Sequence, residues 1–221
     1  CLIKMGAKIE GHGTKTIHVQ GVTKLKKAEH EIISDRIVAG TYIIAALMLN
    51  SALEINNFNT IYLKSLIDIL KKMGAKLKVN KNSIKVFKGS KLKSCSLSTS
   101  PYPGFPTDLQ AQLMSLMCIS DGKSKIKETI FENRFMHVPE LNRLGANITV
   151  EKDTATILGN QTFKGAQVMA SDLRASISLV LAAMNANGQT TLNRVYHLDR
   201  GYENIEKTLG SLGAKIKRQK N

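Results

Sequence analysis

The 221-residue chain is 43% hydrophobic and 5% aromatic, and its 32 basic and 17 acidic residues give a formal net charge of +15. The basic excess points first to nucleic acid, but the lysines are dispersed and aromatic stacking platforms are few, so we expect small anionic substrates and no nucleic-acid partner. No apolar run approaches the roughly 20 residues of a membrane span, and no signal-peptide pattern opens the chain, which favours a cytoplasmic protein without a membrane partner.

A short string containing Gly-Ala recurs four times along the chain. Its glycines stand at positions 6, 74, 145 and 213, at intervals of 68, 71 and 68 residues. This period is too long for the common solenoid repeats and suits a unit the size of a subdomain. The glycine is expected to end a helix, where a left-handed residue without Cβ is favoured.

Each repeat predicts the same elements in the same order. A first helix begins near an aspartate, which caps free backbone N–H groups, and it continues as an apolar run typical of a buried helix. The three runs are residues 43–49, 113–119 and 177–183. A short strand follows (52–55 or 190–192), then an amphipathic helix such as 62–73. A hairpin with strands 76–79 and 83–87 completes the first unit.

The predicted fold class is therefore α/β (α+β), an inside-out α/β barrel built of threefold βαβαββ repeats. One buried helix in each repeat implies sheets that face outward around a helical core. Residues 35–221 are expected to be a complete threefold domain. Residues 1–34 are expected to be the C-terminal tail and linker of a preceding domain, and the start at Cys1 instead of Met favours a fragment.

The three cysteines, Cys1, Cys95 and Cys118, are an odd number without CxxC spacing. We therefore expect reduced thiols and neither a disulfide framework nor a metal site. Cys118 lies in an apolar stretch and is expected to be a small core residue.

Four segments are too specific in composition to be explained by packing alone. They place charged residues beside helix starts and rigid turns. The segments are Pro103-Gly104-Phe105-Pro106-Thr107-Asp108-Leu109-Gln110-Ala111-Gln112, Glu132-Asn133-Arg134-Phe135-Met136-His137-Val138-Pro139-Glu140-Leu141, Asp172-Leu173-Arg174-Ala175-Ser176 and Asp199-Arg200-Gly201-Tyr202-Glu203.

These segments resemble the enolpyruvyl transferase family, in order and along the whole chain. The first two point to the branch that acts on UDP-N-acetylglucosamine, and the other two are shared with the shikimate branch. The resemblance implies two domains of three βαβαββ units that close over a cleft. It implies transfer of the enolpyruvyl group of phosphoenolpyruvate to the 3′-hydroxyl of UDP-N-acetylglucosamine, with release of phosphate and no metal or other cofactor. This is the first committed step of peptidoglycan synthesis, and the full-length enzyme is expected to be monomeric.

The resemblance also implies that this chain holds half of the active site. The family's loop cysteine, a Lys-Asn pair and a loop arginine belong to the N-terminal domain, and this sequence has no match to them. The chain alone is therefore expected to be inactive, and the missing N-terminal domain is an expected partner.

Asp108 matches the family carboxylate that contacts the 3′-hydroxyl of the nucleotide sugar and is proposed as its general base. The alternative is a helix cap, as expected for Asp35 and Asp172. A helix start favours the charged form of a carboxylate, which makes the carboxylate a weaker base. Accurate positioning of the hydroxyl and burial of the site on closure would have to offset this loss of basicity.

Three further residues match active-site positions of the family. Arg200 matches an arginine that reaches the phosphoenolpyruvate end of the cleft, and its guanidinium suits phosphate or carboxylate; its alternative is a salt bridge to Asp199 or Glu203. Asp172 and Arg174 match catalytic positions; their alternatives are a helix cap and an ion pair within the repeat.

The nucleotide sugar is expected to contact Ile130 and Phe131, through the backbone and the ring, and Arg134. Core packing is the alternative for the first two, and an ion pair with Glu132 for Arg134. His137 and His197 lie beside the motifs and are expected to be structural.

Three rival functions remain open at this stage. The shikimate-pathway transferase is the near alternative, although residues 131–141 argue against it. An RNA-acting protein of the same architecture, similar to the RNA 3′-phosphate cyclases, is the distant one. An inactive remnant is the third, against which the intact motif spacing counts.

Overall fold

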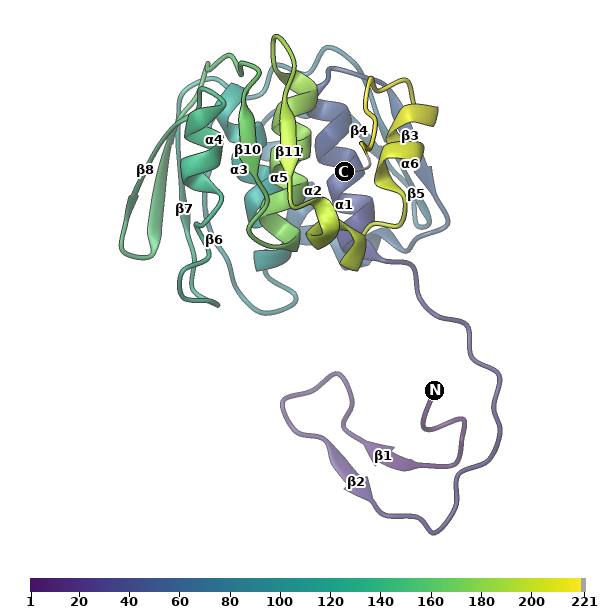
Figure 1. The fold of residues 1–221 in the computed structure, drawn as a ribbon. Coiled ribbons are helices and arrows are strands. Elements are labelled where there is room, and N and C mark those ends of the chain that lie inside the picture. Colours follow the sequence, from purple (N-terminus) through teal and green to yellow (C-terminus); the bar gives the residue numbers. More distant parts are fainter. Residues whose placement is uncertain (220–221) are drawn as a thin grey trace. The chain divides into compact units, whose positions relative to one another are not determined.

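The computed structural model describes residues 1–219 and divides the chain into two compact units, Cys1–Ser34 and Asp35–Asn221 (Figure 1). The last two residues of the domain expected at 35–221 lie outside the described residues. The assignment of 1–34 to a preceding domain stays a prediction.

The first unit contains one small antiparallel ladder. Strand β1 (Lys8–Glu10) pairs with β2 (His18–Gln20), with Lys8 opposite Gln20 and Glu10 opposite His18. Apolar side chains of this unit remain in solvent, as Val19 is 67% and Ile32 84% exposed.

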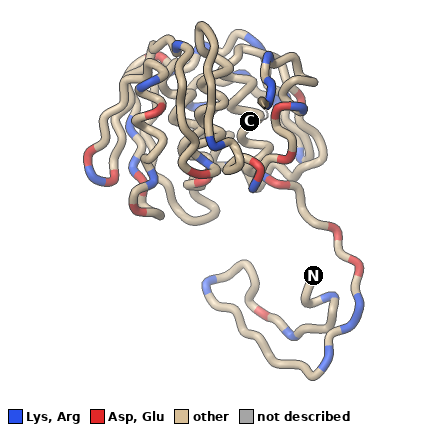
Figure 2. Tube along the Cα trace, viewed as in Figure 1, with Lys and Arg blue, Asp and Glu red and all other residues tan. Residues whose placement is uncertain are grey.

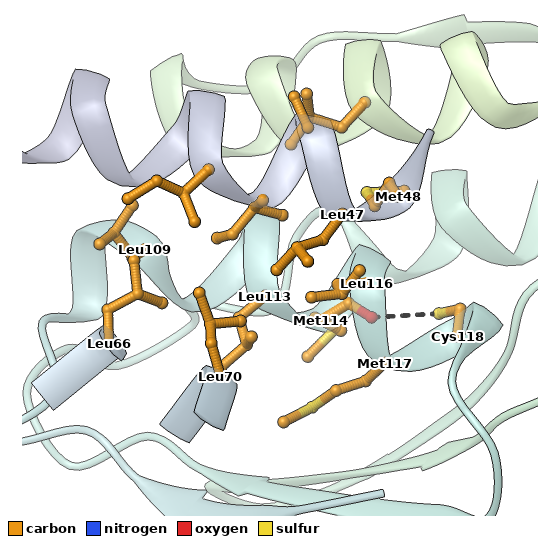
Figure 3. Close-up of a cluster of buried hydrophobic side chains, with 14 of the residues drawn as sticks. Leu47, Met48, Leu66, Leu70, Leu109, Leu113, Met114, Leu116, Met117 and Cys118 are labelled. Carbon is orange, nitrogen blue, oxygen red and sulfur yellow. Dashed lines mark hydrogen bonds between the residues drawn. The ribbon is translucent and has the colours of Figure 1, made fainter. Parts of the chain in front are cut away.

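Three helices form the centre of the second unit: α1 (Arg36–Met48), α3 (Gln110–Ile119) and α5 (Leu173–Asn185). The three contact one another pairwise (Figure 1). They carry apolar residues on nearly every side, and nine of the ten residues of α3 are buried. Leucine and methionine side chains of α1, α2 (Lys64–Lys72) and α3 fill the space between them (Figure 3). The buried-helix prediction is confirmed.

Two sheets lie against this centre. In the first, β3 (Leu53–Asn56), β5 (Ser83–Val86) and β4 (Leu77–Val79) pair antiparallel in that order, and β3 and β5 contact α1. The second has the order β6-β7-β9-β8 and contacts α3. Its strands are β6 (Ser96–Ser98), β7 (Lys123–Lys127), β9 (Thr154–Leu158) and β8 (Asn147–Glu151).

The third repeat is shorter than expected. Strand β10 (Gln167–Met169) pairs parallel with β11 (Thr191–Asn193), and helix α6 (Ile205–Ser211) follows the 3-10 helix η3 (Val195–Arg200). Residues 212–219 form no strand. The mixed α/β class with sheets around a helical core is confirmed, but the sheets among residues 1–219 are separate and do not close a barrel.

The repeated Gly-Ala string is a helix stop, as predicted. At the end of α2 the Gly74 N–H bonds the Lys71 carbonyl and the Ala75 N–H bonds the Leu70 carbonyl, both at 2.9 Å. This is the Schellman pattern, and Gly74 has a φ of +98°. The same two bonds form after α4 (Val138–Arg143), after α6 and at Gly6-Ala7.

Charged residues are spread along the whole described trace, with acidic residues among the basic ones (Figure 2). No helix within residues 1–219 combines the length and the apolar character that a membrane crossing requires.

Candidate active site

Asp108 differs from the two aspartates at equivalent positions. Asp35 and Asp172 each cap a helix by accepting two backbone N–H bonds, from Ile37 and Val38 and from Arg174 and Ala175. Asp108 lies inside the 3-10 turn η2 (Thr107–Leu109), one turn before α3, and makes no cap hydrogen bond. The cap expectation is therefore correct for two positions, and at Asp108 the carboxylate is free for other contacts.

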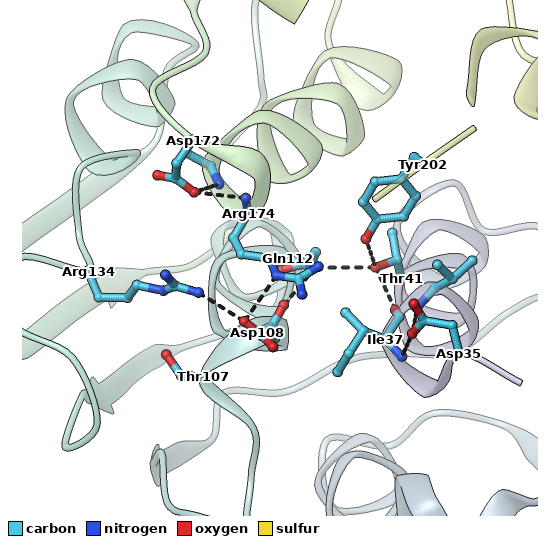
Figure 4. Close-up of polar contacts among 12 residues, drawn as sticks. Asp35, Ile37, Thr41, Thr107, Asp108, Gln112, Arg134, Asp172, Arg174 and Tyr202 are labelled. Atoms are coloured by element: carbon cyan, nitrogen blue, oxygen red, sulfur yellow. Dashed lines mark hydrogen bonds and ion pairs between the residues drawn. The ribbon is translucent and has the colours of Figure 1, made fainter. Parts of the chain in front are cut away.

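Two arginines converge on the Asp108 carboxylate (Figure 4). Arg134 Nη2 and Arg174 Nε each donate to Oδ1 at 3.0 Å. Oδ2 accepts no hydrogen bond from any residue between 1 and 219. The Asp108 side chain is 39% exposed and those of Arg134 and Arg174 are 24% and 20% exposed. One oxygen is held by two guanidinium groups, and the other has no hydrogen-bond partner within residues 1–219.

Neither arginine makes the structural ion pair considered as its alternative. Arg174 donates to Asp108 across repeats, while the Asp172 carboxylate receives its backbone N–H. Arg134 pairs with Asp108 and not with Glu132, and its guanidinium carbon lies 5.1 Å from the centre of the Phe131 ring. Phe131 is 54% exposed, so this cation–π pair stands at the surface.

Arg200 is exposed at the end of η3 and forms no hydrogen bond or ion pair within residues 1–219. The alternative salt bridges to Asp199 and Glu203 do not form. Asp199 pairs instead with Arg218 at 2.6 Å, which lowers the pKa of the Asp199 carboxyl. Arg200 therefore has a free guanidinium available to an anion.

Ile130 is half-buried, and its backbone N–H, like that of Phe131, donates to the Glu128 carboxylate at 2.9 and 3.3 Å. Glu128 is only 4% exposed. Sequence reasoning missed this residue, which also accepts hydrogen bonds from Thr99 and Thr107.

A buried chain of hydrogen bonds joins the three repeats beneath the site (Figure 4). Gln112 donates to the Asp108 carbonyl at 3.0 Å and to the Thr41 hydroxyl at 3.2 Å, and Thr41 bonds the Tyr202 hydroxyl at 2.8 Å. Burial raises the pKa of Tyr202, so the phenol stays protonated and can donate. The turn that carries Asp108 is thus tied to the segment that follows Arg200.

Two histidines lie beside the motifs. His137 is 1% exposed, and burial, with the nearby Arg134 charge opposed by Asp172, lowers its pKa to about 4. Its Nε2 has no hydrogen-bond partner within residues 1–219, nor do the side-chain amide atoms of Gln110, and nothing in the structure explains these unpaired atoms. The His197 ring stacks against Tyr196 with centroids 4.3 Å apart.

Cys95 and Cys118 lie in the hydrophobic core of the second unit. Cys118 is fully buried, as expected for a small core residue, and burial raises its pKa to about 12. Among residues 1–219 no group of three or more His, Cys, Asp or Glu side chains is arranged to hold a metal ion.

The structure brings Asp108, Arg134 and Arg174 together, and Oδ2 of Asp108 has no hydrogen-bond partner within residues 1–219. This cluster can accept a proton and offers positive charge to an anion, and Arg200 supplies a further exposed guanidinium at the end of η3. Residues 1–209 match the model of the EPSP synthase (3-phosphoshikimate 1-carboxyvinyltransferase) family. The chain belongs to this family.

Relatives agree along nearly the whole chain. It is 53% identical over 219 residues to a UDP-N-acetylglucosamine 1-carboxyvinyltransferase of Azorhizobium caulinodans and 51% identical over 217 residues to one of Pelagibacter ubique, covering 99% and 98% of this chain. It covers only 51% and 52% of those relatives. The chain spans about half the length of the curated relatives it matches.

Solved structures give the same fold. The enolpyruvyl transferase NikO from Streptomyces tendae superposes with a TM-score of 0.89 at 30% identity, over 97% of this chain and 52% of that one. An EPSP synthase from Acinetobacter baumannii superposes with a TM-score of 0.77 at 19% identity, which supports the fold alone.

Proposed function

We propose that the complete protein transfers the enolpyruvyl group of phosphoenolpyruvate to the 3′-hydroxyl of UDP-N-acetylglucosamine and releases phosphate. This chain contributes one wall of the cleft. The observation that carries the proposal is the Asp108 carboxylate with one oxygen held by two arginines and the other open. The names of the relatives at 51% and 53% identity support the choice of acceptor.

The residues divide the work by their chemistry. The unpaired oxygen of Asp108 takes the proton of the sugar's 3′-hydroxyl group, while the oxygen of that hydroxyl group attacks C2 of phosphoenolpyruvate. A proton donated from the N-terminal half completes the methyl group at C3 and gives a tetrahedral adduct. Loss of phosphate and of a C3 proton then forms the enol ether. Arg174 and Arg200 stabilise the phosphate and carboxylate charges, which fixed guanidiniums do without losing their own charge.

The sugar end of the cleft is assigned to the segment that follows β7. The backbone of Ile130 and the exposed ring of Phe131 contact the nucleotide sugar, and Arg134 orients both the ring and Asp108. Asp172 acts through Arg174, because it fixes the helix start from which that side chain extends.

The wider role follows from the reaction. We place the protein in the cytoplasm, at the first committed step of peptidoglycan synthesis and so in cell-wall growth and division. It acts as a monomer whose second domain is this chain, and it uses no metal or other cofactor and no nucleic-acid or membrane partner.

The test joins the N-terminal half of the Azorhizobium caulinodans relative to this chain as one polypeptide. Phosphate release should require phosphoenolpyruvate and UDP-N-acetylglucosamine together, and this chain alone should release none. Turnover by the chain alone would contradict the division of labour.

Two further arms address the rival functions. Turnover with shikimate 3-phosphate in place of the nucleotide sugar would assign the shikimate reaction. Salt-dependent RNA binding that UDP-N-acetylglucosamine does not displace would favour an RNA-acting protein.

A further inference from the structure

We propose that Glu128 is a positioning residue that fixes the Asp108 turn relative to the Ile130–Phe131 segment. The inference rests on the proposed function, since it concerns the general base and the sugar contact of that reaction. Glu128 itself is buried and is hydrogen-bonded to both segments.

The Glu128 carboxylate accepts four hydrogen bonds and divides them between its two oxygens. Oε1 accepts from Thr99 Oγ1 at 2.8 Å, Ile130 N at 2.9 Å and Phe131 N at 3.3 Å. Oε2 accepts from Thr107 Oγ1 at 2.9 Å. Thr107 is the neighbour of Asp108, so one rigid carboxylate joins the two segments expected to hold the reacting hydroxyl and the sugar.

The energetics argue that this arrangement is more than packing. A carboxylate that is 4% exposed loses hydration, and burial is tolerated only when hydrogen bonds replace the lost water. No lysine or arginine among residues 1–219 forms an ion pair with Glu128. Neutral donors alone hold the charge, and such fully satisfied buried groups rigidify their surroundings.

The backbone around Glu128 is fixed from both sides. The Glu128 N–H donates to the Asp153 carbonyl at 2.8 Å, while the Thr129 N–H and hydroxyl bond the Thr99 hydroxyl and carbonyl at 2.9 and 2.6 Å. The carboxylate therefore cannot follow a displaced Asp108 turn. It holds that turn to a fixed reference at the end of β7.

These contacts form a closed loop. Glu128 accepts from Thr107, and the next residue, Asp108, accepts from Arg134. Arg134 lies over the ring of Phe131, and the backbone N–H of Phe131 donates to Glu128. Because general-base catalysis depends steeply on geometry, loosening this closed loop of contacts at Thr107 should affect turnover more than binding.

The sharpest variant is Thr107→Val, which keeps the side-chain shape and removes one donor. In the joined polypeptide we expect kcat to fall about tenfold or more with the KM for UDP-N-acetylglucosamine within about twofold. Thr107→Ser should restore kcat. The control is Thr60→Val, another threonine that is 8% exposed and donates to the Asn80 carbonyl at 2.7 Å, away from the site. It should leave both constants unchanged.

Glu128 is tested by two substitutions. Glu128→Ala should lower kcat and raise the KM, because it releases both segments. Glu128→Gln should retain most activity, since one oxygen remains for Thr99 and the two amides and the Thr107 hydroxyl can turn to accept from the new NH₂ group. Equal kcat for Thr107→Val and the wild type would overturn the proposal.

A spectroscopic arm separates this inference from the proposed function. In the 221-residue chain without substrate, Thr107→Val should shift the Arg174 Nε–H NMR resonance and speed its exchange, and Thr60→Val should not. If the joined polypeptide shows no turnover, the function fails and this arm still decides the positioning role. An unchanged Arg174 resonance in Thr107→Val would refute it.

Discussion

Arg174 Nε lies 3.0 Å from Asp108 Oδ1, although 66 residues separate the two in the chain. The ion pair joins the first turn of α5 to the turn before α3, so the second and third repeats meet at one carboxylate. Arg134 reaches the same oxygen from within the second repeat. The candidate site is thus an assembly between repeats, which neither repeat contains by itself.

Asp108→Asn in the joined polypeptide should lower kcat by about 10²- to 10⁴-fold, because an amide cannot take the hydroxyl proton. The KM for UDP-N-acetylglucosamine should change little. Asp35→Asn is the matched control, since asparagine also caps helices and Asp35 only caps α1. Steady-state kinetics measure both, and an Asp108→Asn enzyme with more than about a tenth of the wild-type kcat would contradict the base assignment.

Arg200→Ala should reduce kcat/KM for phosphoenolpyruvate by roughly 10- to 100-fold, the effect of losing one or two hydrogen bonds to a charged group. Its melting temperature should match the wild type, because Arg200 has no partner within residues 1–219.

Arg218→Ala should show the opposite pattern, with unchanged kinetics and slightly lower stability. Arg218 pairs with Asp199 and Glu206, so its removal should leave kcat/KM unchanged and lower stability by at most about 1 kcal/mol. The same kinetic loss in both variants would indicate a general electrostatic effect and not a contact of Arg200.

The Tyr202–Thr41 hydrogen bond is buried and joins the first and third repeats. Tyr202→Phe should lower the free energy of unfolding by about 1 kcal/mol. A double-mutant cycle with Thr41→Val, measured by urea unfolding, should show a coupling of about 0.5–1.5 kcal/mol. Strict additivity would mean that the two hydroxyls do not interact.

Stability should decrease as the pH falls below the ordinary pKa of histidine. Burial holds the pKa of His137 at about 4 in the folded chain, whereas an unfolded histidine titrates near 6.5. Between these values only the unfolded state binds the proton, so the free energy of unfolding should drop by about 3 kcal/mol from pH 7 to pH 4.

Urea unfolding of the wild type and of His137→Phe across that range measures this contribution. The variant should lose about that part of the pH dependence. Parallel curves for the two proteins would show that another group is responsible.

Gly74→Ala should be more destabilising than Gly213→Ala. Both glycines have nearly the same φ, +98° and +97°, so the strain of a left-handed alanine, about 1 kcal/mol, is shared. At Gly74 the new Cβ would also lie 2.8 Å from the Lys91 carbonyl oxygen, and at Gly213 nothing lies within 4 Å. Thermal denaturation of the two variants gives the difference, and equal losses would rule out the steric term.

Local patterns predicted the parts of the fold that local forces decide. The apolar runs gave the buried helices, the Gly-Ala strings gave the helix ends, and alternation gave the hairpin of β4 and β5. Residues 212–219 form no strand after Gly213, which was not predicted, because the string at Gly213 resembles the others and strand formation depends on long-range pairing.

The site was predicted less completely than the fold. The motifs predicted Asp108, Arg134 and Arg174 as site residues. That both arginines pair with Asp108 could not be predicted, because this pairing depends on the tertiary fold and not on spacing along the chain. Glu128 left a signal that was overlooked. Ser124 and Ile126 point inward along β7, and Glu128 continues the same alternation just after the strand. A charged residue at an inward-facing position must have hydrogen-bond partners to replace the lost water.

The Gly-Ala turn at Gly6 has its two hydrogen bonds, from Gly6 to the Ile3 carbonyl at 2.9 Å and from Ala7 to the Leu2 carbonyl at 3.0 Å, in a unit that has little apolar burial. In three copies the carbonyl of the residue before the glycine also accepts a backbone N–H from 20 or 21 residues further along the chain: Lys26 to Met5 at 2.7 Å, Lys93 to Met73 at 2.8 Å and Lys164 to Leu144 at 2.7 Å. The string therefore fixes where a later stretch of the chain returns, as well as where a helix ends.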